Sequence, residues 1–117
     1  MTTTRAKLPK PPAHLTESTR VWWRSVVRDY ALEPHHLRLL QAACEAWDRL
    51  QQAREALASD GLTVKGREGG IRPHPAVAIE RDSRVGFSRL IRELDLDVEG
   101  PSASGRRPPA LASNRRG

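Results

Sequence analysis

The sequence predicts a mainly α-helical fold of three helices, one of them long, with a small β-hairpin between the second and third helices. Apolar residues recur at three- and four-residue spacing in three segments, which is typical of amphipathic helices. The longest pattern stops at Asp60-Gly61, and two short β-prone pieces, 62–64 and 71–72, then flank a Gly-rich turn. Because so small a hairpin is unstable alone in water, we expect the neighbouring helices to hold it.

The first helix follows an extended segment, because three of the five residues in 8–12 are proline. Thr16 is the expected N-cap, and Glu17 is favourable near the positive end of the helix. The apolar face of this helix consists of Trp22, Trp23, Val26, Val27 and Tyr30.

The second helix is expected from about His35 to Ser59, with Pro34 just before it and Gly61 just after it. It carries two adjacent apolar seams. The Ala-rich seam consists of Leu39, Ala43, Ala46, Leu50, Ala53 and Leu57, and the other of Leu40, Cys44 and Trp47. The Ala-rich seam permits close helix approach and is the candidate interface with another copy of the chain. The alternative is that both seams close one bundle within the chain.

The third helix is expected from about Pro75 to Leu94, with His74 at its N-cap. We divide the chain into a flexible, basic, Pro-rich arm (1–14), one helical domain (15–97) with the hairpin at about 62–72, and a disordered basic tail (98–117). A domain of this size is marginally stable alone, and oligomerisation is an ordinary remedy.

The net charge of +6 is unevenly distributed along the chain. Residues 1–14 and 100–117 contain basic but no acidic side chains, the hairpin region is also basic, and the helical segments are slightly acidic. Positive charge in turns and arms can reach a polyanion without distorting the fold. Simple solubilising tails are the alternative.

Candidate DNA contacts follow from this charge distribution. Three arginines of the first helix, at i, i+4 and i+8, form a stripe that can follow phosphates. The alternative is a solvated face paired with Glu17 and Asp29. The hairpin, the arm and the tail supply further cations. The full set is Arg20, Arg24, Arg28, Lys65, Arg67, Arg72, Lys7, Lys10, Arg106 and Arg107.

The sequence offers little for an enzyme, a cofactor or a metal. Cys44 is the single cysteine and lies in an apolar run, where a cysteine acts as a small hydrophobe. His35 and His36 are adjacent, so on a helix they point about 100° apart instead of sharing a face. The Gly-rich turn lacks the Lys-Ser/Thr pair of a phosphate-binding loop. We therefore predict no catalytic activity, no cofactor and no metal site.

No apolar run reaches the roughly 18 residues of a membrane span. The first residues also lack the apolar core of a signal peptide. We therefore expect a cytoplasmic protein with no membrane partner.

The sequence resembles the small subunit of phage terminases over roughly residues 8–97. The most specific parts are Arg72-Pro-His-Pro-Ala-Val77 and Arg89-Leu-Ile-Arg-Glu-Leu-Asp-Leu96. The Pro-rich start, Val21-Trp22, residues 44–47 and residues 60–64 follow the same order. Two positions depart from the family pattern: His74 stands where Asn is usual, and Asp95 stands where Gly is common.

The resemblance implies a non-enzymatic packaging factor in the cytoplasm of a bacterial host. Members form ring-like homo-oligomers, bind the packaging site on concatemeric double-stranded viral DNA, and regulate the large ATPase/nuclease subunit. The implied partners are viral DNA, the large subunit and copies of the chain itself. One alternative is a small helical DNA-binding transcriptional regulator that reads DNA with residues 34–47, although its helices are long for that role. Another is a structural virion protein.

Overall fold

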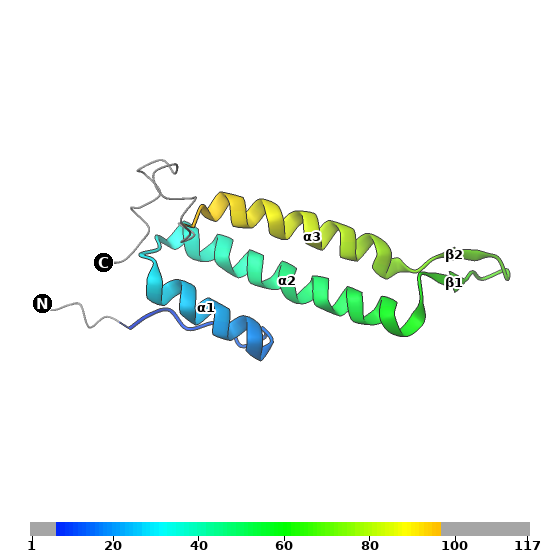
Figure 1. Ribbon diagram of the computed structural model, residues 1–117, viewed down its shortest axis with the longest axis horizontal. Helices are drawn as coiled ribbons and strands as arrows, with labels where there is room; N and C mark the ends of the chain where they lie inside the picture. The colour runs from blue at the N-terminus through cyan, green and yellow to red at the C-terminus, as the bar shows by residue number, and fades with distance from the viewer. Residues whose placement is uncertain (1–6, 97–117) are drawn as a thin grey trace, which may run out of the picture.

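The computed structural model describes residues 7–96 of the 117-residue chain. The predicted tail 98–117 and residues 1–6 of the predicted arm lie outside the described residues. The elements follow in the order α1 (Glu17–Asp29), α2 (Pro34–Asp60), β1 (Thr63–Lys65), β2 (Ile71–Pro73) and α3 (Pro75–Leu94). The predicted fold class is confirmed: three helices with an antiparallel hairpin between α2 and α3 (Figure 1).

Helices α2 and α3 form a long antiparallel pair that is extended at one end by the hairpin (Figure 1). Helix α2 has 27 residues and is therefore about 40 Å long. The rings of Trp47 and Phe87 lie 5.1 Å apart between the two helices, and Arg54 Nε lies 3.4 Å from a carboxylate oxygen of Glu80. Helix α1 lies beside the other end of the pair, away from the hairpin (Figure 1).

The hydrophobic core lies where α1 meets this pair. Its buried side chains come from all three helices and the segment before α1: Leu15, Trp23, Val26, Val27, Leu40, Ala43, Cys44 and Leu94. Toward the hairpin, the buried hydrophobic residues of the described chain are Leu50, Ala53 and Ala76. The core therefore thins out along the pair.

Burial in this core keeps the thiol of Cys44 unreactive. Its side chain is fully buried, and burial, helped by the nearby charges of Asp48 and Glu45, raises the pKa of the thiol to about 12. A thiol with this pKa stays protonated near neutral pH, and the protonated form is a poor nucleophile.

The start of α1 is fastened to α2 by one buried carboxylate. Asp48 accepts hydrogen bonds from the Thr16 backbone N–H (2.8 Å), the Thr16 hydroxyl (2.9 Å) and the Thr19 hydroxyl (2.6 Å). Burial would raise the pKa of Asp48, but these hydrogen bonds outweigh it and hold the pKa below its usual value. Thr16 is the N-cap of α1, as the sequence predicts.

Residues 7–14, the described part of the predicted arm, run along α1. The indole N–H of Trp23 donates to the Pro9 carbonyl (3.0 Å), and His14 Nε2 lies 2.8 Å from a carboxylate oxygen of Glu45 on α2. These contacts link the Pro-rich segment to the three-helix end of the molecule.

The base of the hairpin is tied to both long helices. His74 caps α3, because its Nδ1 accepts from the Ala76 N–H (2.9 Å), while its Nε2 lies 2.9 Å from Asp60 Oδ2 at the end of α2. The hydrogen bond from His74 lowers the pKa of the Asp60 carboxyl. The His74 backbone N–H also donates to the Leu62 carbonyl (2.8 Å). The hairpin is therefore a fixed extension of the α2–α3 pair.

Two residues with positive φ end the long helices. Gly61 follows α2 with φ of 85°, which glycine adopts readily. Asp95 follows α3 with φ of 54°, a conformation that Asp tolerates better than most residues. Asp95 thus takes a backbone conformation that a glycine would adopt more readily.

Candidate nucleic-acid interface

The arginine stripe of α1 is largely paired with nearby acidic residues. Arg20 is half-buried and donates to Glu17 (2.7 Å) and to the Ala13 carbonyl (3.3 Å), so it helps hold the N-terminal segment. Arg24 lies 3.7 Å from Glu17, and Arg28 lies 3.2 Å from Asp29. The hydrogen bond and charge of Arg20, and then the charge of Arg24, lower the pKa of Glu17. Arg24 and Arg28 remain exposed, whereas Arg20 has a structural contact.

The three cations of the hairpin are exposed, and within residues 7–96 no acidic side chain forms an ion pair with them. The register pairs Lys65 with Ile71 and Val64 with Arg72. Because cross-strand partners lie on the same side of the ribbon and successive residues on opposite sides, Lys65 and Arg72 lie on opposite faces. Arg67 lies in the turn between them. These cations surround the hairpin and do not form one stripe.

The remaining candidates lie toward the two ends of the chain. Lys7 and Lys10 are exposed in the segment beside α1. Arg106 and Arg107 lie outside the described residues.

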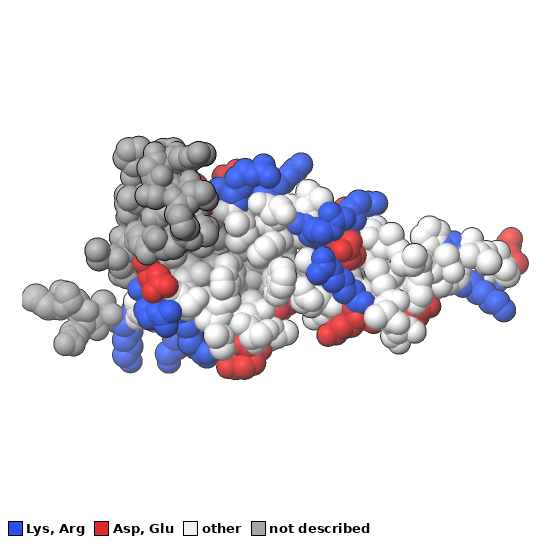
Figure 2. All heavy atoms as spheres, in the orientation of Figure 1, with Lys and Arg blue, Asp and Glu red and all other residues white. Residues whose placement is uncertain are grey.

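A row of arginines on α3 is a further candidate that the charge distribution along the chain did not single out. All four members are exposed: Arg81, Arg84, Arg89 and Arg92. At 100° per residue they occupy the side of α3 that is turned away from α2. Figure 2 shows basic side chains over α3 on the same face of the molecule as those near α1. The helical spacing in the sequence already contained this signal, but the acidic neighbours Glu80 and Asp82 made the segment look like an ordinary charged surface.

Within the α3 row, the two ends differ in their pairing. Arg81 lies 3.3 Å from Asp82, and Arg84 lies 3.4 Å from Glu80. For Arg89 and Arg92, the described part of the chain provides no acidic partner within ion-pair distance. The end of the row near the three-helix core therefore has guanidinium groups available to an external anion.

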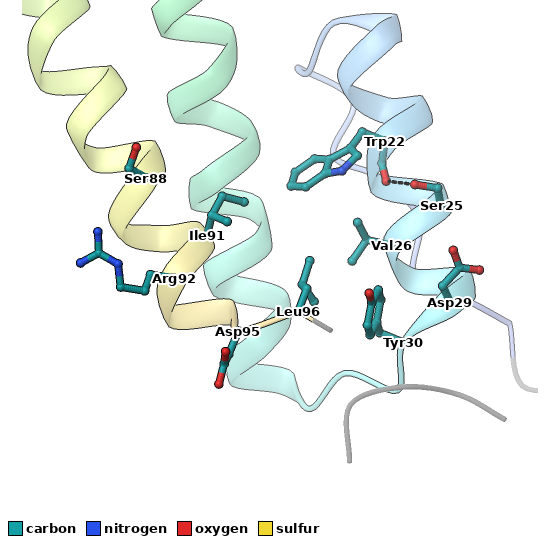
Figure 3. Close-up of a pocket in the computed structure, with 10 residues that line it drawn as sticks. All are labelled: Trp22, Ser25, Val26, Asp29, Tyr30, Ser88, Ile91, Arg92, Asp95 and Leu96. Atoms are coloured by element: carbon teal, nitrogen blue, oxygen red, sulfur yellow. Dashed lines mark hydrogen bonds between the residues drawn. The ribbon is translucent and has the colours of Figure 1, made fainter. Parts of the chain in front are cut away.

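The space between α1 and the α2–α3 pair is incompletely filled. One groove, of about 580 Å³, is lined by Ser18, Thr19, Trp22, Trp47 and Phe87. We call it the aromatic groove. The Trp22 and Phe87 rings lie 6.3 Å apart across it. Trp22 also lines an adjoining cavity of about 700 Å³ between α1 and α3, where Val26, Tyr30, Ile91 and Leu96 face one another (Figure 3).

The Ala-rich seam of α2 is used mainly inside the chain. Ala43, Leu50 and Ala53 are buried, so in this conformation they are not available to a second copy. The other three members, Leu39, Ala46 and Leu57, are half-buried. A second copy could therefore contact this seam only at its half-buried members.

Two adjacent histidines at the start of α2 make local contacts. His36 accepts a hydrogen bond from the Glu33 N–H (3.0 Å) at the start of α2, and its ring lies 4.0 Å from that of His35. Partial burial, followed by the neighbouring His35, lowers the pKa of His36. Among residues 7–96, no three His, Cys, Asp or Glu side chains form a group that could hold a metal ion.

None of the described helices is both long enough and apolar enough to span a membrane.

Comparison with known families decides where this chain belongs. The family model described as "Phage terminase, small subunit" matches residues 20–106, which is most of the chain. The protein belongs to the phage terminase small subunit family. No curated protein and no solved structure showed significant similarity to the chain.

Membership of this family supports a role in phage DNA packaging. The matched range includes all three helices except the first turn of α1, the whole hairpin, and the α3 arginine row. Terminase small subunits are generally non-catalytic.

Proposed function

We propose that this terminase small subunit is a non-catalytic packaging factor that acts in the cytoplasm of the bacterial host. It assembles into a cyclic homo-oligomer, binds the packaging site on concatemeric double-stranded viral DNA, and regulates the large ATPase/nuclease subunit. The family match over residues 20–106 carries this proposal. Its physical support comes from exposed basic side chains on three separate elements.

DNA contact is proposed first for the α3 row and the hairpin. Arg89, Arg92 and the hairpin cations have no acidic partner in the described chain, so a phosphate would not have to displace an existing ion pair. Guanidinium groups also bind phosphate through two parallel hydrogen bonds. Arg24 and Arg28 come next, since their acidic partners are exposed and weakly held. Lys7, Lys10, Arg106 and Arg107 would add non-specific attraction.

The salt dependence of DNA binding tests this assignment. Neutralising about six phosphates gives a slope of about −5 for log affinity against log salt. We expect Arg89→Gln/Arg92→Gln to make that slope shallower by about 1 to 2, because each lost phosphate contact removes about 0.9. Fluorescence anisotropy with labelled duplex DNA, across a series of salt concentrations, provides the measurement.

A matched control separates local contacts from net charge. Arg38→Gln/Arg49→Gln also removes two exposed arginines, but from α2. If both double variants change the slope equally, net charge alone sets the affinity and the α3 assignment is wrong. Wild-type binding that ignores salt would contradict the electrostatic proposal altogether.

Solution mass tests the proposed assembly. Size-exclusion chromatography with light scattering at moderate salt should show a closed assembly of many subunits. A monomer or a simple dimer at high protein concentration would contradict the cyclic homo-oligomer and leave the family role without its expected architecture.

A further inference from the structure

Two exposed apolar features lie at different places on the chain. One is the aromatic groove beside α1, where Trp47 is 37% exposed although it lies between two helices. The other is the hairpin, where Ile71 is 77% exposed, the highest value among the exposed large hydrophobic residues of the described chain. Leaving a large aliphatic side chain in water forgoes the free energy that its burial would provide.

The hairpin presents Ile71 on a defined face. The register pairs Thr63 with Pro73 and Lys65 with Ile71, so these four residues share one side of the ribbon. All four are exposed. We call this side the Ile71 face. It projects from the end of the α2–α3 pair, because the hairpin base is fastened by His74.

The aromatic groove has the complementary character. Its walls are the rings of Trp22, Trp47 and Phe87, with ring centroids 5.1 Å apart for Trp47 and Phe87 and 6.3 Å apart for Trp22 and Phe87. Ser18 and Thr19 of α1 provide its polar edge. Its volume of about 580 Å³ lies within the range of sites that hold compact apolar groups.

The Ile71 face does not reach the groove of its own chain. From Trp47 to Asp60, α2 alone spans about 20 Å, and the hairpin continues beyond that end. A second copy of the chain has no such restriction. The lining of the groove contains no charged side chain, so the Ile71 side chain of that copy can be buried there without desolvating an ion pair.

We propose that the Ile71 face of the hairpin docks in the aromatic groove of a neighbouring copy. The inference rests on the proposed homo-oligomer and assigns the surfaces that hold it together. Because the two surfaces differ, the contact is heterologous, and repetition of a heterologous contact closes a ring when the rotation between copies permits it. DNA alone would leave Ile71 without an apolar partner, and docking still leaves Arg67 and Arg72 to DNA, because of the three hairpin cations only Lys65 lies on the docked face.

Two single substitutions, each at an exposed residue, disable one surface at a time. Ile71→Ser removes the apolar group of the hairpin, and Ser18→Arg places a long charged side chain at the edge of the groove. Val85→Ser is the matched control, because Val85 is an exposed aliphatic residue outside both surfaces. Circular dichroism and thermal unfolding should show that all three variants keep the wild-type fold.

Light scattering then gives the mass of each variant. We expect Ile71→Ser and Ser18→Arg each to raise the subunit concentration needed for assembly by roughly tenfold or more, whereas Val85→Ser keeps the wild-type mass. An equimolar mixture of Ile71→Ser and Ser18→Arg should form a one-to-one heterodimer, because one intact groove and one intact hairpin remain in the mixture.

The outcomes distinguish this inference from the function on which it rests. A wild-type protein that stays monomeric overturns the proposed assembly itself. A wild-type assembly whose mass is unchanged by both variants overturns only the hairpin-to-groove contact. The same holds if Ile71→Ser keeps the wild-type mass and instead weakens DNA binding, since the Ile71 face would then contact DNA.

Discussion

The two ends of this molecule differ in how their apolar residues are used. At the α1 end, three helices and the segment before α1 enclose a core in which Leu40, Cys44 and Leu94 are fully buried. At the hairpin end, only two helices continue, and Leu62 and Ile71 are 67% and 77% exposed. Sequence composition alone does not separate the two ends, because both contain aliphatic residues.

This difference indicates a division of roles. Burial at the α1 end provides most of the apolar free energy available to a single chain. The hairpin end obtains its shape from the fixed geometry of α2, α3 and the His74 contacts, and its apolar residues remain available for a partner. We therefore expect substitutions at the α1 end to change unfolding, and substitutions at the hairpin end to change association.

The largest expected effect on unfolding comes from Leu40→Ala. Removing a fully buried leucine should lower the free energy of unfolding by about 3 kcal/mol, because burial is lost and a cavity remains. Ile71→Ala should change it by less than about 0.5 kcal/mol, since its side chain already faces water. Urea unfolding of dilute protein, where association is minimal, provides the comparison. Equal losses would show that the two ends are not distinct.

Asp48→Ala should have the next largest effect. Thr16 and Thr19 would lose their acceptor at a site where Asp48 is 8% exposed, at a cost of about 2 to 3 kcal/mol. Asp82→Ala removes a carboxylate from an exposed pair with Arg81 and should cost less than about 1 kcal/mol. Thermal unfolding of both variants checks this. If the two losses were similar, the Asp48 contacts would not anchor α1.

The pH dependence of the unfolding free energy tests the contribution of the Asp48 carboxylate in a second way. The folded pKa of Asp48 is lowered, so its contribution is fully present above the usual pKa of about 4 and is lost as the pH falls through the lower folded pKa. The difference in unfolding free energy between the wild type and Asp48→Asn should therefore shrink as the pH falls below about 4. Denaturant titrations at several pH values measure it. A difference independent of pH would mean that the charge of Asp48 contributes nothing.

The smallest expected effect lies at the hairpin base. His74→Ala removes the cap of α3 and should cost about 1 kcal/mol, whereas His74→Asn keeps a capping side chain and should cost less. Hydrogen exchange should show faster exchange of the hairpin amides in His74→Ala, because the His74 contacts fix the hairpin to α2. Unchanged hairpin exchange would show that the strands are held without this residue.

Much of this fold could be predicted from local sequence signals. Proline and glycine mark the ends of α2, the spacing of apolar residues identifies the three helices, and the Gly-rich turn identifies the hairpin. The predicted limits of α3, Pro75 and Leu94, agree with the structure. These features depend on residues that are close together in the chain.

Contacts between residues far apart in the chain could not be predicted from such local signals. The seam that contains Leu50 and Ala53 has a clear helical period, but the period does not say whether α3 or another copy covers it. Asp48 and Thr16 are 32 residues apart, so nothing local connects them. The sequence contained one hint of a buried carboxylate at this position. Asp48 directly follows Trp47, the last residue of the seam that contains Leu40 and Cys44.

The candidate binding surfaces could be predicted only in part from the sequence. The spacing of Arg24 and Arg28 gave their common face and offered pairing with Glu17 and Asp29 as the alternative, but it did not decide which arginine takes which partner. The aromatic groove combines residues of α1, α2 and α3, and its existence depends on how α1 packs. The spacing of residues within one helix does not tell how α1 is oriented relative to α2 and α3.

The buried position of Cys44 has a practical consequence for following this protein in solution. The sequence contains no other cysteine, and the Cys44 thiol is shielded and stays protonated near neutral pH. A cysteine introduced into the hairpin turn, for example Glu68→Cys, would therefore be the single site open to maleimide dyes. Fluorescence from that one position could report on the tip of the molecule without first removing the native thiol.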